Sequence, residues 1–365
     1  MIIQHHQVTD YRNILGAELE PSPHITVISG ENGQGKTNLL ESVWLLSGAK
    51  SFRGSKDGEL IRRGQPFSRI LSQVSSDEQS KTVEIRINGE ESDKKGRYAW
   101  VNGVEMGRAA ALAGQFFSVV FAPAHLSLVK GPPEGRRRFI DAALCQLYPG
   151  YIGVLRRYTR LLQQKNALLK ELRRQQTAAG LDLLDVMDQE LSVYGCELSL
   201  RRANYIQKIA PPAMEEYVRI SHGREELVLA YQPTALKKEE LFAALVRQRA
   251  EDIRAGFCTV GPHREDLVLQ LDKEDARIFA SQGQQRSIVL CLKLAEAGEV
   301  QRVSGEAPVI LLDDVLSELD VHRQDYLLNQ LTRQQVIVTS CDSDLFAKTN
   351  GRIYEMKEGR LIEKE

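Results

Sequence analysis

The sequence predicts an α/β fold, and three observations support this prediction. A Gly-rich loop of the form G-x-x-x-x-G-K-[ST] lies between a β-branched run at residues 25–28 and an apolar helical pattern at residues 37–46. Continuous apolar runs at residues 309–312 and 336–339 are typical of parallel strands buried on both faces. Alternating runs that end in Asn-Gly, at residues 83–89 and 98–103, indicate hairpins, so we expect antiparallel strands as well.

The order of these patterns divides the chain into a head and an insert. After Gly131 and two prolines the pattern becomes helical and charged, with helices expected over residues 155–174 and 181–210 and Pro211-Pro212 as a stop. β-type patterns return at residues 261–271. We therefore expect residues 1–122 and 257–365 to form the head, and residues 123–256 to form an inserted α-helical arm or lid domain.

Composition excludes several classes of protein. The 365 residues are 42% hydrophobic and 27% charged, as in an ordinary globular protein, and no apolar run approaches membrane-spanning length. The N-terminus lacks the pattern of a signal peptide, so we expect a cytoplasmic protein with no membrane partner. The five cysteines include no C-x-x-C pair, which argues against a zinc hook or a disulfide framework. A net charge of -1 leaves nucleic-acid binding open, since a local basic patch is what matters.

The Gly-rich loop has the composition of a phosphate-binding loop. Its backbone N–H groups can surround phosphate oxygens at the N-terminus of the following helix. We expect Lys36 to reach the β- and γ-phosphates of a nucleotide and the Thr37 hydroxyl to bind Mg²⁺. The predicted nucleotide-binding residues are Gly30, Glu31, Asn32, Gly33, Gln34, Gly35, Lys36 and Thr37.

Two carboxylates follow the apolar run at residues 309–312. Asp313 ends the predicted strand, where a lone carboxylate needs a cation, and Mg²⁺ beside Thr37 is the natural partner. Asp314 stands where a general base would polarise the attacking water. Aspartate is one methylene shorter than glutamate, so the water would be less well placed. The alternative is that both residues merely cap a strand.

A second candidate anion site precedes the helix expected from residue 284. Ser281, Gln282, Gly283 and Gln284 form an S-x-G-Q motif at a helix N-terminus, which favours anions. One chain needs only one such cradle per triphosphate, so we expect this one to cap the γ-phosphate bound by another subunit. The alternative is an ordinary helix N-cap by Ser281.

A basic segment lies in the predicted arm. Arg156, Arg157 and Arg160 can line one side of a helix, either as a solvated face or as contacts with DNA phosphates. Arg136, Arg137 and Arg138 are consecutive and cannot share one helix face, so we expect one of them to pair with Asp141. The segment has little aromatic interleaving, which favours contact with a duplex backbone over stacking on single strands.

In their residues and their order, these motifs resemble those of the ATP-binding-cassette ATPases of chromosome maintenance, and specifically those of the RecF family of bacterial DNA replication and repair proteins. The resemblance spans nearly the whole chain. It is carried by Tyr11-Arg12-Asn13, the phosphate loop through Asn38, Gly131-Pro132-Pro133, Arg137-Arg138-Phe139-Ile140-Asp141, Gly261-Pro262-His263-Arg264, Ser281-Gln282-Gly283-Gln284-Gln285-Arg286, and the run from Leu312 to Asp320.

The resemblance implies an ABC-type P-loop ATPase head that binds ATP and Mg²⁺ and forms an ATP-dependent homodimer. Such a dimer would clamp double-stranded DNA near single-strand/double-strand junctions, hydrolyse ATP slowly, and work with RecR and RecO to load RecA. It places Arg12 and Asn13 beside the nucleotide and Asp320 at the dimer seam. It also implies a bacterial cytoplasmic location. The candidate DNA contacts are Arg137, Arg138, Arg156, Arg157 and Arg160.

The chain departs from the cassette pattern in two places. The switch histidine of the cassette would fall near Thr339-Ser340-Cys341, where there is none. No glutamine stands at the lobe junction around Phe121, and the first one upstream is Gln115. Both departures predict slow hydrolysis, as in a timer or clamp rather than a motor.

Three other interpretations compete with this one. A head from SMC-like ATPases would carry long coiled coils, which the short insert and the missing C-x-x-C argue against. A transporter motor subunit typically carries the switch histidine and needs a surface for a membrane partner. A non-catalytic scaffold would use ATP only to hold a dimer together, and an Asp314→Asn substitution would leave such a scaffold unchanged.

Overall fold

The computed structural model describes residues 1–76, 79–341 and 351–364, which form two compact units. The head unit comprises Met1–Leu126, Arg219–His222 and Gln282–Glu365, and the arm unit comprises Ser127–Val218 and Gly223–Ser281. Residues 257–281 group with the arm unit, because strand β10 (Asp266–Leu271) pairs with β9 (Leu227–Gln232). The domain boundaries predicted at residues 123 and 257 therefore stay a proposal.

A mostly parallel sheet forms the centre of the head unit. Its order is β15-β14-β3-β13-β12-β8, and every pair is parallel except β14 with β15. All residues of β8, β12 and β13 are buried, which agrees with the continuous apolar runs in the sequence. The strands are β3 (Ile25–Ser29), β8 (Ser118–Phe121), β12 (Val309–Asp313), β13 (Val336–Ser340), β14 (Arg352–Lys357) and β15 (Arg360–Lys364).

The second sheet of the head unit is antiparallel, with the order β2-β1-β4-β5-β6-β7. Asn102 and Gly103 join β6 to β7 at φ values of 51° and 78°, as a two-residue hairpin requires. Asn88 ends β5, which pairs antiparallel with β6, so the predicted hairpin is confirmed, with residues 89–95 as its loop. The strands are β1 (Ile2–Tyr11), β2 (Ile14–Leu19), β4 (Phe67–Ser75), β5 (Ser80–Asn88), β6 (Gly96–Val101) and β7 (Val104–Arg108).

In the part of the head unit that the structure describes, three longer helices pack. Helix α1 (Lys36–Leu45) follows the Gly-rich loop and contacts both sheets through β1 and β13. Helix α8 (Gln282–Ser304) contacts β8, and α9 (Val321–Gln330) contacts α8. The short 3-10 turns are η1 (Asp57–Leu60), η2 (Ala109–Leu112), η3 (Pro123–Leu126) and η4 (Leu316–Glu318).

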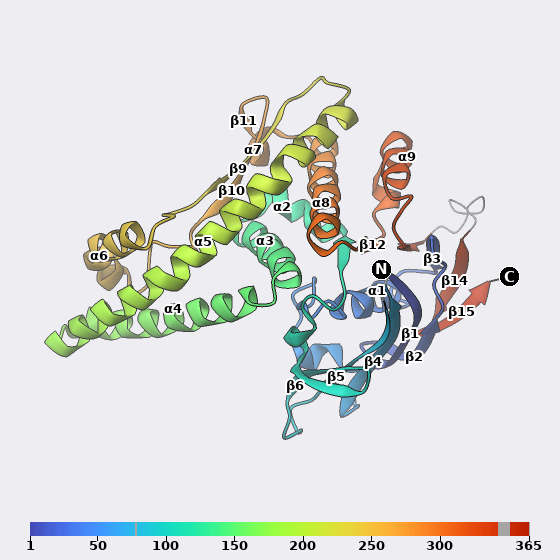
Figure 1. Ribbon diagram of the computed structural model, residues 1–365, viewed down its shortest axis with the longest axis horizontal. Helices are drawn as coiled ribbons and strands as arrows, with labels where there is room; N and C mark the ends of the chain where they lie inside the picture. The colour runs from blue at the N-terminus through green and yellow to red at the C-terminus, as the bar shows by residue number, and fades with distance from the viewer. Residues whose placement is uncertain (77–78, 342–350, 365) are drawn as a thin grey trace. The chain divides into compact units, whose positions relative to one another are not determined.

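The arm unit is mainly helical, and α4 (Tyr151–Arg174) turns back into α5 (Ala178–Ser221) at residues 175–177 (Figure 1). The predicted stop at Pro211-Pro212 is wrong, because α5 continues through both prolines. Buried Ile209, Ala213 and Tyr217 on the flanking turns offset the lost backbone hydrogen bonds. The remaining elements are α2 (Ser127–Lys130), α3 (Pro133–Leu147), α6 (Lys238–Ala255), α7 (Ala276–Phe279) and β11 (Glu274–Asp275).

Within the described residues, none of the helices combines the length and the apolar character that a membrane span requires.

Candidate nucleotide-binding site

The Gly-rich loop adopts a backbone that only glycine allows at two positions. Gly35 has a φ of 118° directly before α1, and Gly30 has a φ of 144°. A Cβ atom on Gly30 would lie 2.4 Å from the carbonyl oxygen of Met356. The two glycines therefore allow the tight backbone that leads into the N-terminus of α1, where an anion such as phosphate is favoured.

Lys36 extends along this loop rather than into solvent. Its ammonium donates to the carbonyl of Gly30 and to that of Glu31 at 2.9 Å, and the side chain is buried. The same Nζ lies 3.5 Å from the Cys341 sulfur, and this thiol donates to Asn32 Oδ1 at 3.1 Å. Cys341 thus contacts the phosphate loop from the end of β13, near the point where the cassette pattern has its histidine.

Thr37 and Asp313 meet although 276 residues separate them. The Thr37 hydroxyl donates to Asp313 Oδ1 at 2.7 Å, and the Thr339 hydroxyl donates to the same oxygen at 3.0 Å. Burial raises the pKa of Asp313, and these two hydrogen bonds oppose the rise.

The Thr37 and Asp313 pair fits Mg²⁺, which prefers oxygen ligands and takes few from the protein when a nucleotide supplies the others. The described part of the chain contains no group of three or more His, Cys, Asp or Glu side chains that could hold a metal.

Asp314 lies next to this pair with a φ of 52°. Its N–H donates to Thr339 Oγ1 at 3.0 Å, which fixes the backbone beside Asp313. The Ser317 hydroxyl donates to Asp314 Oδ1, also at 3.0 Å. The carboxylate is therefore held in place at the end of β12, and it is only half-buried.

The Tyr11-Arg12-Asn13 motif at the end of β1 contacts the phosphate loop and α1. Asn13 donates to the Gly33 carbonyl at 3.0 Å and accepts from Asn38 at 2.7 Å. Arg12 instead pairs with Glu41 at 2.7 Å, and the buried Glu41 carboxylate also accepts from Tyr11 at 2.9 Å. Sequence reasoning did not single out Glu41; an acidic residue on the apolar helix after the loop was the available signal.

Sequence reasoning also missed the contact of the C-terminal hairpin with the loop. In the turn between β14 and β15, the Glu358 N–H donates to Gln34 Oε1 at 2.7 Å and the Gly359 N–H donates to the Gln34 carbonyl at 3.2 Å. Gly359 has a φ of 71°, and a Cβ atom there would lie 2.3 Å from the Asn13 carbonyl oxygen. The turn and Asn13 thus hold two consecutive residues of the loop, Gln34 and Gly33.

The S-x-G-Q motif begins α8, with Ser281 and Gln282 exposed and Gly283 and Gln284 half-buried. Asp320 caps α9 by accepting from the N–H of Arg323, and it also pairs with the Arg323 guanidinium. Arg323 in turn donates to Ser287 Oγ at 2.8 Å. Arg323 therefore links Asp320 to the first turns of α8.

The arginines predicted to contact DNA differ in their exposure to solvent. Arg156, Arg157 and Arg160 are exposed on α4, and Arg138 is exposed on α3. Arg137 is half-buried and donates to the Glu265 carbonyl at 2.6 Å. The predicted partner of Asp141 is wrong, because Arg202 of α5 pairs with it at 2.8 and 2.9 Å, while Arg136 pairs with Asp266.

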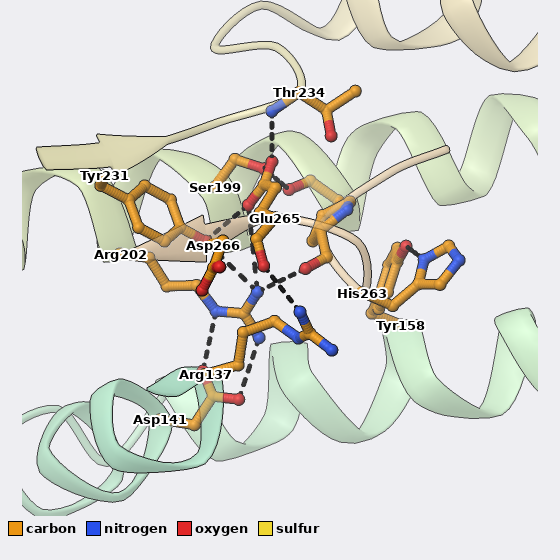
Figure 2. A network of polar contacts seen from close by, with 12 residues as sticks. Arg137, Asp141, Tyr158, Ser199, Arg202, Tyr231, Thr234, His263, Glu265 and Asp266 are labelled. Carbon is orange, nitrogen blue, oxygen red and sulfur yellow. Dashed lines mark hydrogen bonds and ion pairs between the residues drawn. The ribbon is translucent and has the colours of Figure 1, made fainter. Parts of the chain in front are cut away.

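Figure 2 shows the polar network of the arm unit to which Arg202 and Arg137 belong. Glu265 accepts from the hydroxyls of Ser199 and Tyr231, both at 2.6 Å. His263 bonds to the Tyr158 hydroxyl at 2.8 Å, and burial lowers its pKa to about 4. The family-specific motifs at residues 137–141 and 261–264 thus meet in one network, which gives them a structural role in the arm.

Comparison with known proteins places this geometry in a family. The protein-family model described as "RecF/RecN/SMC N terminal domain" matches residues 2–361. The "DNA replication and repair protein RecF" of Lactobacillus delbrueckii subsp. bulgaricus is 39% identical, over 100% of this chain and 98% of the relative. That of Heliobacterium modesticaldum is 40% identical over 99% of both chains.

Comparison with solved structures gives the same family. One described as "the recombination mediator protein RecF-ATPrS in RecFOR pathway" has a TM-score of 0.91 and 31% identity, covering 100% of this chain and 98% of its own. A RecF-ATP structure has a TM-score of 0.90 and 30% identity, covering 100% and 97%. An Smc head domain of Pyrococcus furiosus has a TM-score of 0.55 and 16% identity, covering 100% and 96%, and shares the fold alone.

Proposed function

This chain belongs to the RecF family of DNA replication and repair proteins, and on that premise we propose that it is an ATP-dependent clamp on DNA. In this proposal the clamp binds duplex DNA near single-strand gaps and helps RecO and RecR to load RecA. The 2.7 Å hydrogen bond between Thr37 and Asp313 is the observation that carries the proposal. It joins the phosphate loop to the carboxylate strand, which is the arrangement that a nucleoside triphosphate with its metal requires.

The proposed site binds ATP through the loop backbone and Lys36. The Lys36 ammonium already lies among the loop carbonyls, from which it can move to phosphate oxygens. Thr37 and Asp313 would hold Mg²⁺, which when bound neutralises charge on the phosphates. Asn13 and the Glu358–Gly359 turn hold the loop through Gly33 and Gln34.

We assign the orientation of the attacking water to Asp314. Its carboxylate is half-exposed and steadied by Ser317, so it can accept a hydrogen bond from a water. The shorter aspartate side chain and Cys341 in place of a histidine both fit slow hydrolysis. A scaffold that never hydrolyses ATP is the alternative. A lifetime of the ATP-bound dimer that is longer in Asp314→Asn than in the wild type supports hydrolysis, and an unchanged lifetime supports the scaffold.

The second half of the site is proposed to come from a second copy of the chain. Ser281 is exposed at the start of α8, where N–H groups attract an anion. Asp320 is tied to α8 through Arg323 and would move with it at the dimer seam. ATP would therefore stabilise the dimer by contacting the loop of one copy and α8 of the other.

DNA binding is proposed for the exposed arginines of the arm unit. Arg156, Arg157 and Arg160 are the stronger candidates, because Arg137 is engaged in the network of Figure 2. Phosphate contacts of this kind are independent of sequence and weaken with salt. A protein that acts on the chromosome in this way would work in the bacterial cytoplasm.

Sedimentation of the purified chain with and without ATP and Mg²⁺, in the presence of a gapped duplex, tests the proposal. We expect an ATP-dependent shift from monomer to dimer that retains the DNA. The shift should be lost in Lys36→Met and Ser281→Arg, and it should persist in Gln301→Arg, which places the same charge at an exposed position near the other end of α8. A monomer under all conditions, or DNA binding that ignores nucleotide, would contradict the proposed clamp.

A further inference from the structure

The outer face of the antiparallel sheet carries a row of basic and aromatic side chains that no sequence motif indicated. In the register of the strands, Arg69 of β4 lies opposite Arg86 of β5, Arg86 lies opposite Tyr98 of β6, and Tyr98 lies opposite Arg108 of β7. Neighbouring strands are about 4.8 Å apart, so the row spans about 14 Å. Trp100 lies beside it, on the same face of β6 as Tyr98.

Three cations lie close to the two aromatic rings of this face. The Arg86 guanidinium lies 4.9 Å from the centre of the Trp100 ring, and that of Arg108 lies 4.7 Å from the centre of the Tyr98 ring. The Lys94 ammonium lies 5.8 Å from the Tyr98 ring. These cation–π contacts hold the Arg86 and Arg108 guanidinium groups beside the rings.

The opposite face of the same strands is buried. Val83, Ile85 and Ile87 alternate with Glu84 and Arg86 along β5 and are fully buried. Arg97, which precedes Tyr98 and points to the buried side, pairs with Asp57 of η1. By contrast, the Arg86 side chain is 49% exposed. The row therefore lies on the solvent side of the sheet.

On the strands, this face has one more positive than negative charge. Arg69, Arg86 and Arg108 supply three positive charges, and Glu84 and Glu105 supply two negative ones, so the sum is +1. Glu84 bonds to both Arg69 and Arg86, with N···O distances of 2.6 to 3.0 Å. This shared carboxylate holds the two guanidinium groups in position for a further anion.

We propose that this face, formed by Arg69, Arg86, Tyr98, Trp100 and Arg108, binds single-stranded nucleic acid. Unpaired bases stack on aromatic rings and on guanidinium planes, and the phosphates bind the same cations. A duplex offers phosphates but hides the faces of its bases, so the two aromatic side chains favour a single strand. The site goes beyond the proposed duplex clamp and depends neither on ATP nor on the arginines of the arm unit.

The chain contains its own reporter for this site. It has two tryptophans, and Trp44 is 3% exposed with its Nε1 bonded to the Lys50 carbonyl. Changes in tryptophan fluorescence on binding therefore report mainly on Trp100. We expect an oligothymidylate of about 15 nucleotides, added to the full chain without ATP, to quench the emission, and high salt to reverse the quenching.

Substitutions on this face test which side chains contribute to oligothymidylate binding. Tyr98→Ala and Arg86→Ala should weaken binding of a labelled oligothymidylate by about fivefold or more, measured by fluorescence anisotropy. Tyr98→Phe keeps the ring and should bind like the wild type. Arg352→Ala is the control, because Arg352 is similarly exposed and also pairs with glutamates, but lies on β14 in the other sheet. Thermal unfolding of each variant separates lost binding from lost folding.

The proposal would be overturned if the wild type, Tyr98→Ala and Arg86→Ala bound oligothymidylate with equal affinity. It would also be overturned if a duplex of the same length quenched the tryptophan emission as strongly as oligothymidylate does. Equal quenching by polyglutamate would overturn it as well, because the face would then be a general polyanion site. The Lys36→Met variant keeps this test separate from the proposed clamp. Binding that persists in Lys36→Met supports an ATP-independent site even if the ATP-dependent dimer is never observed.

Discussion

At the scale of single residues, Asp313 shows how function can cost stability. Its carboxylate is 6% exposed, and it accepts hydrogen bonds from two hydroxyl groups. Burial raises its pKa, so between the ordinary aspartate pKa and the raised value the folded state binds more protons than the unfolded state. The free energy of unfolding therefore falls as the pH rises through that window, and the loss persists at neutral pH.

We predict that Asp313→Asn raises the Tm of the nucleotide-free protein at neutral pH. The amide oxygen can accept the same two hydrogen bonds without a buried charge. The gain over the wild type should shrink as the pH falls toward the ordinary aspartate pKa of 3.8. Adding ATP and Mg²⁺ should raise the Tm of the wild type but not of the variant. A variant that is less stable than the wild type at neutral pH would contradict this account of Asp313.

A second residue-scale prediction concerns Cys341, which contacts Lys36 and Asn32 of the phosphate loop. It is exposed, whereas Cys258 and Cys291 are buried and the other two cysteines are half-buried. A maleimide should therefore react first at Cys341, and ATP with Mg²⁺ should slow this reaction several-fold by covering the loop. Mass spectrometry of digested protein identifies the site, and Cys341→Ser is the control. Labelling that nucleotide does not slow would separate Cys341 from the phosphates.

At the scale of elements, the C-terminal hairpin acts as a support for the phosphate loop. Substitution of Gly359 by alanine would place a Cβ atom 2.3 Å from the Asn13 carbonyl oxygen, so the turn must move away from Asn13 and its hydrogen bonds to Gln34 are disturbed. We predict that Gly359→Ala weakens ATP binding about tenfold or more, because a small displacement of a binding loop costs orders of magnitude. Titration of a fluorescent ATP analogue measures the effect.

Gly305→Ala is the matched control for this substitution. Gly305 also has a positive φ, 76°, but a Cβ atom there meets open space. It should share the backbone strain, about 1–3 kcal/mol, without the loss of ATP binding. Equal ATP affinity in Gly359→Ala and the wild type would show that the hairpin does not position the loop.

Elements with strong local patterns could be predicted from the sequence, and elements that depend on tertiary contacts could not. The buried strands β12 and β13 and helix α1 follow the predicted apolar patterns. Helix α5 passes through Pro211 and Pro212 because its flanking turns are buried, which local propensity cannot register. The hairpin β14–β15 went unpredicted because its role depends on Gln34, more than 300 residues earlier.

At the scale of the whole molecule, the site draws on both ends of the chain. The proximity of the phosphate loop to Asp313 follows from two short linear motifs, and the role of Ser281 toward a second copy stays a prediction. Contacts that depend on tertiary structure could not be predicted. They are the pairing of Arg12 with Glu41, the hydrogen bond of the Glu358–Gly359 turn to Gln34, and the row of arginines on the antiparallel sheet. All of them arise only from the register and packing of distant segments. The sequence contains these residues but no local signal that joins them.

This arrangement predicts that the two units differ in their ability to fold alone. In the head unit, β3 pairs with β13 and β14, and β8 pairs with β12, so a fragment of residues 1–126 lacks the neighbours of both strands. Its apolar strands would face solvent and promote aggregation. The arm unit is almost contiguous, from Ser127 to Ser281, and contains its own buried network (Figure 2).

We therefore expect residues 127–281 to fold as a monomeric fragment with a cooperative thermal transition, and residues 1–126 to aggregate or lack such a transition. Circular dichroism and size-exclusion chromatography of the two fragments test this. Arg202→Met should abolish the transition of the first fragment, because it leaves Asp141 and Glu265 without their cation. A cooperative transition in residues 1–126 alone would mean that the antiparallel sheet suffices for folding and that the C-terminal strands complete the nucleotide site afterwards.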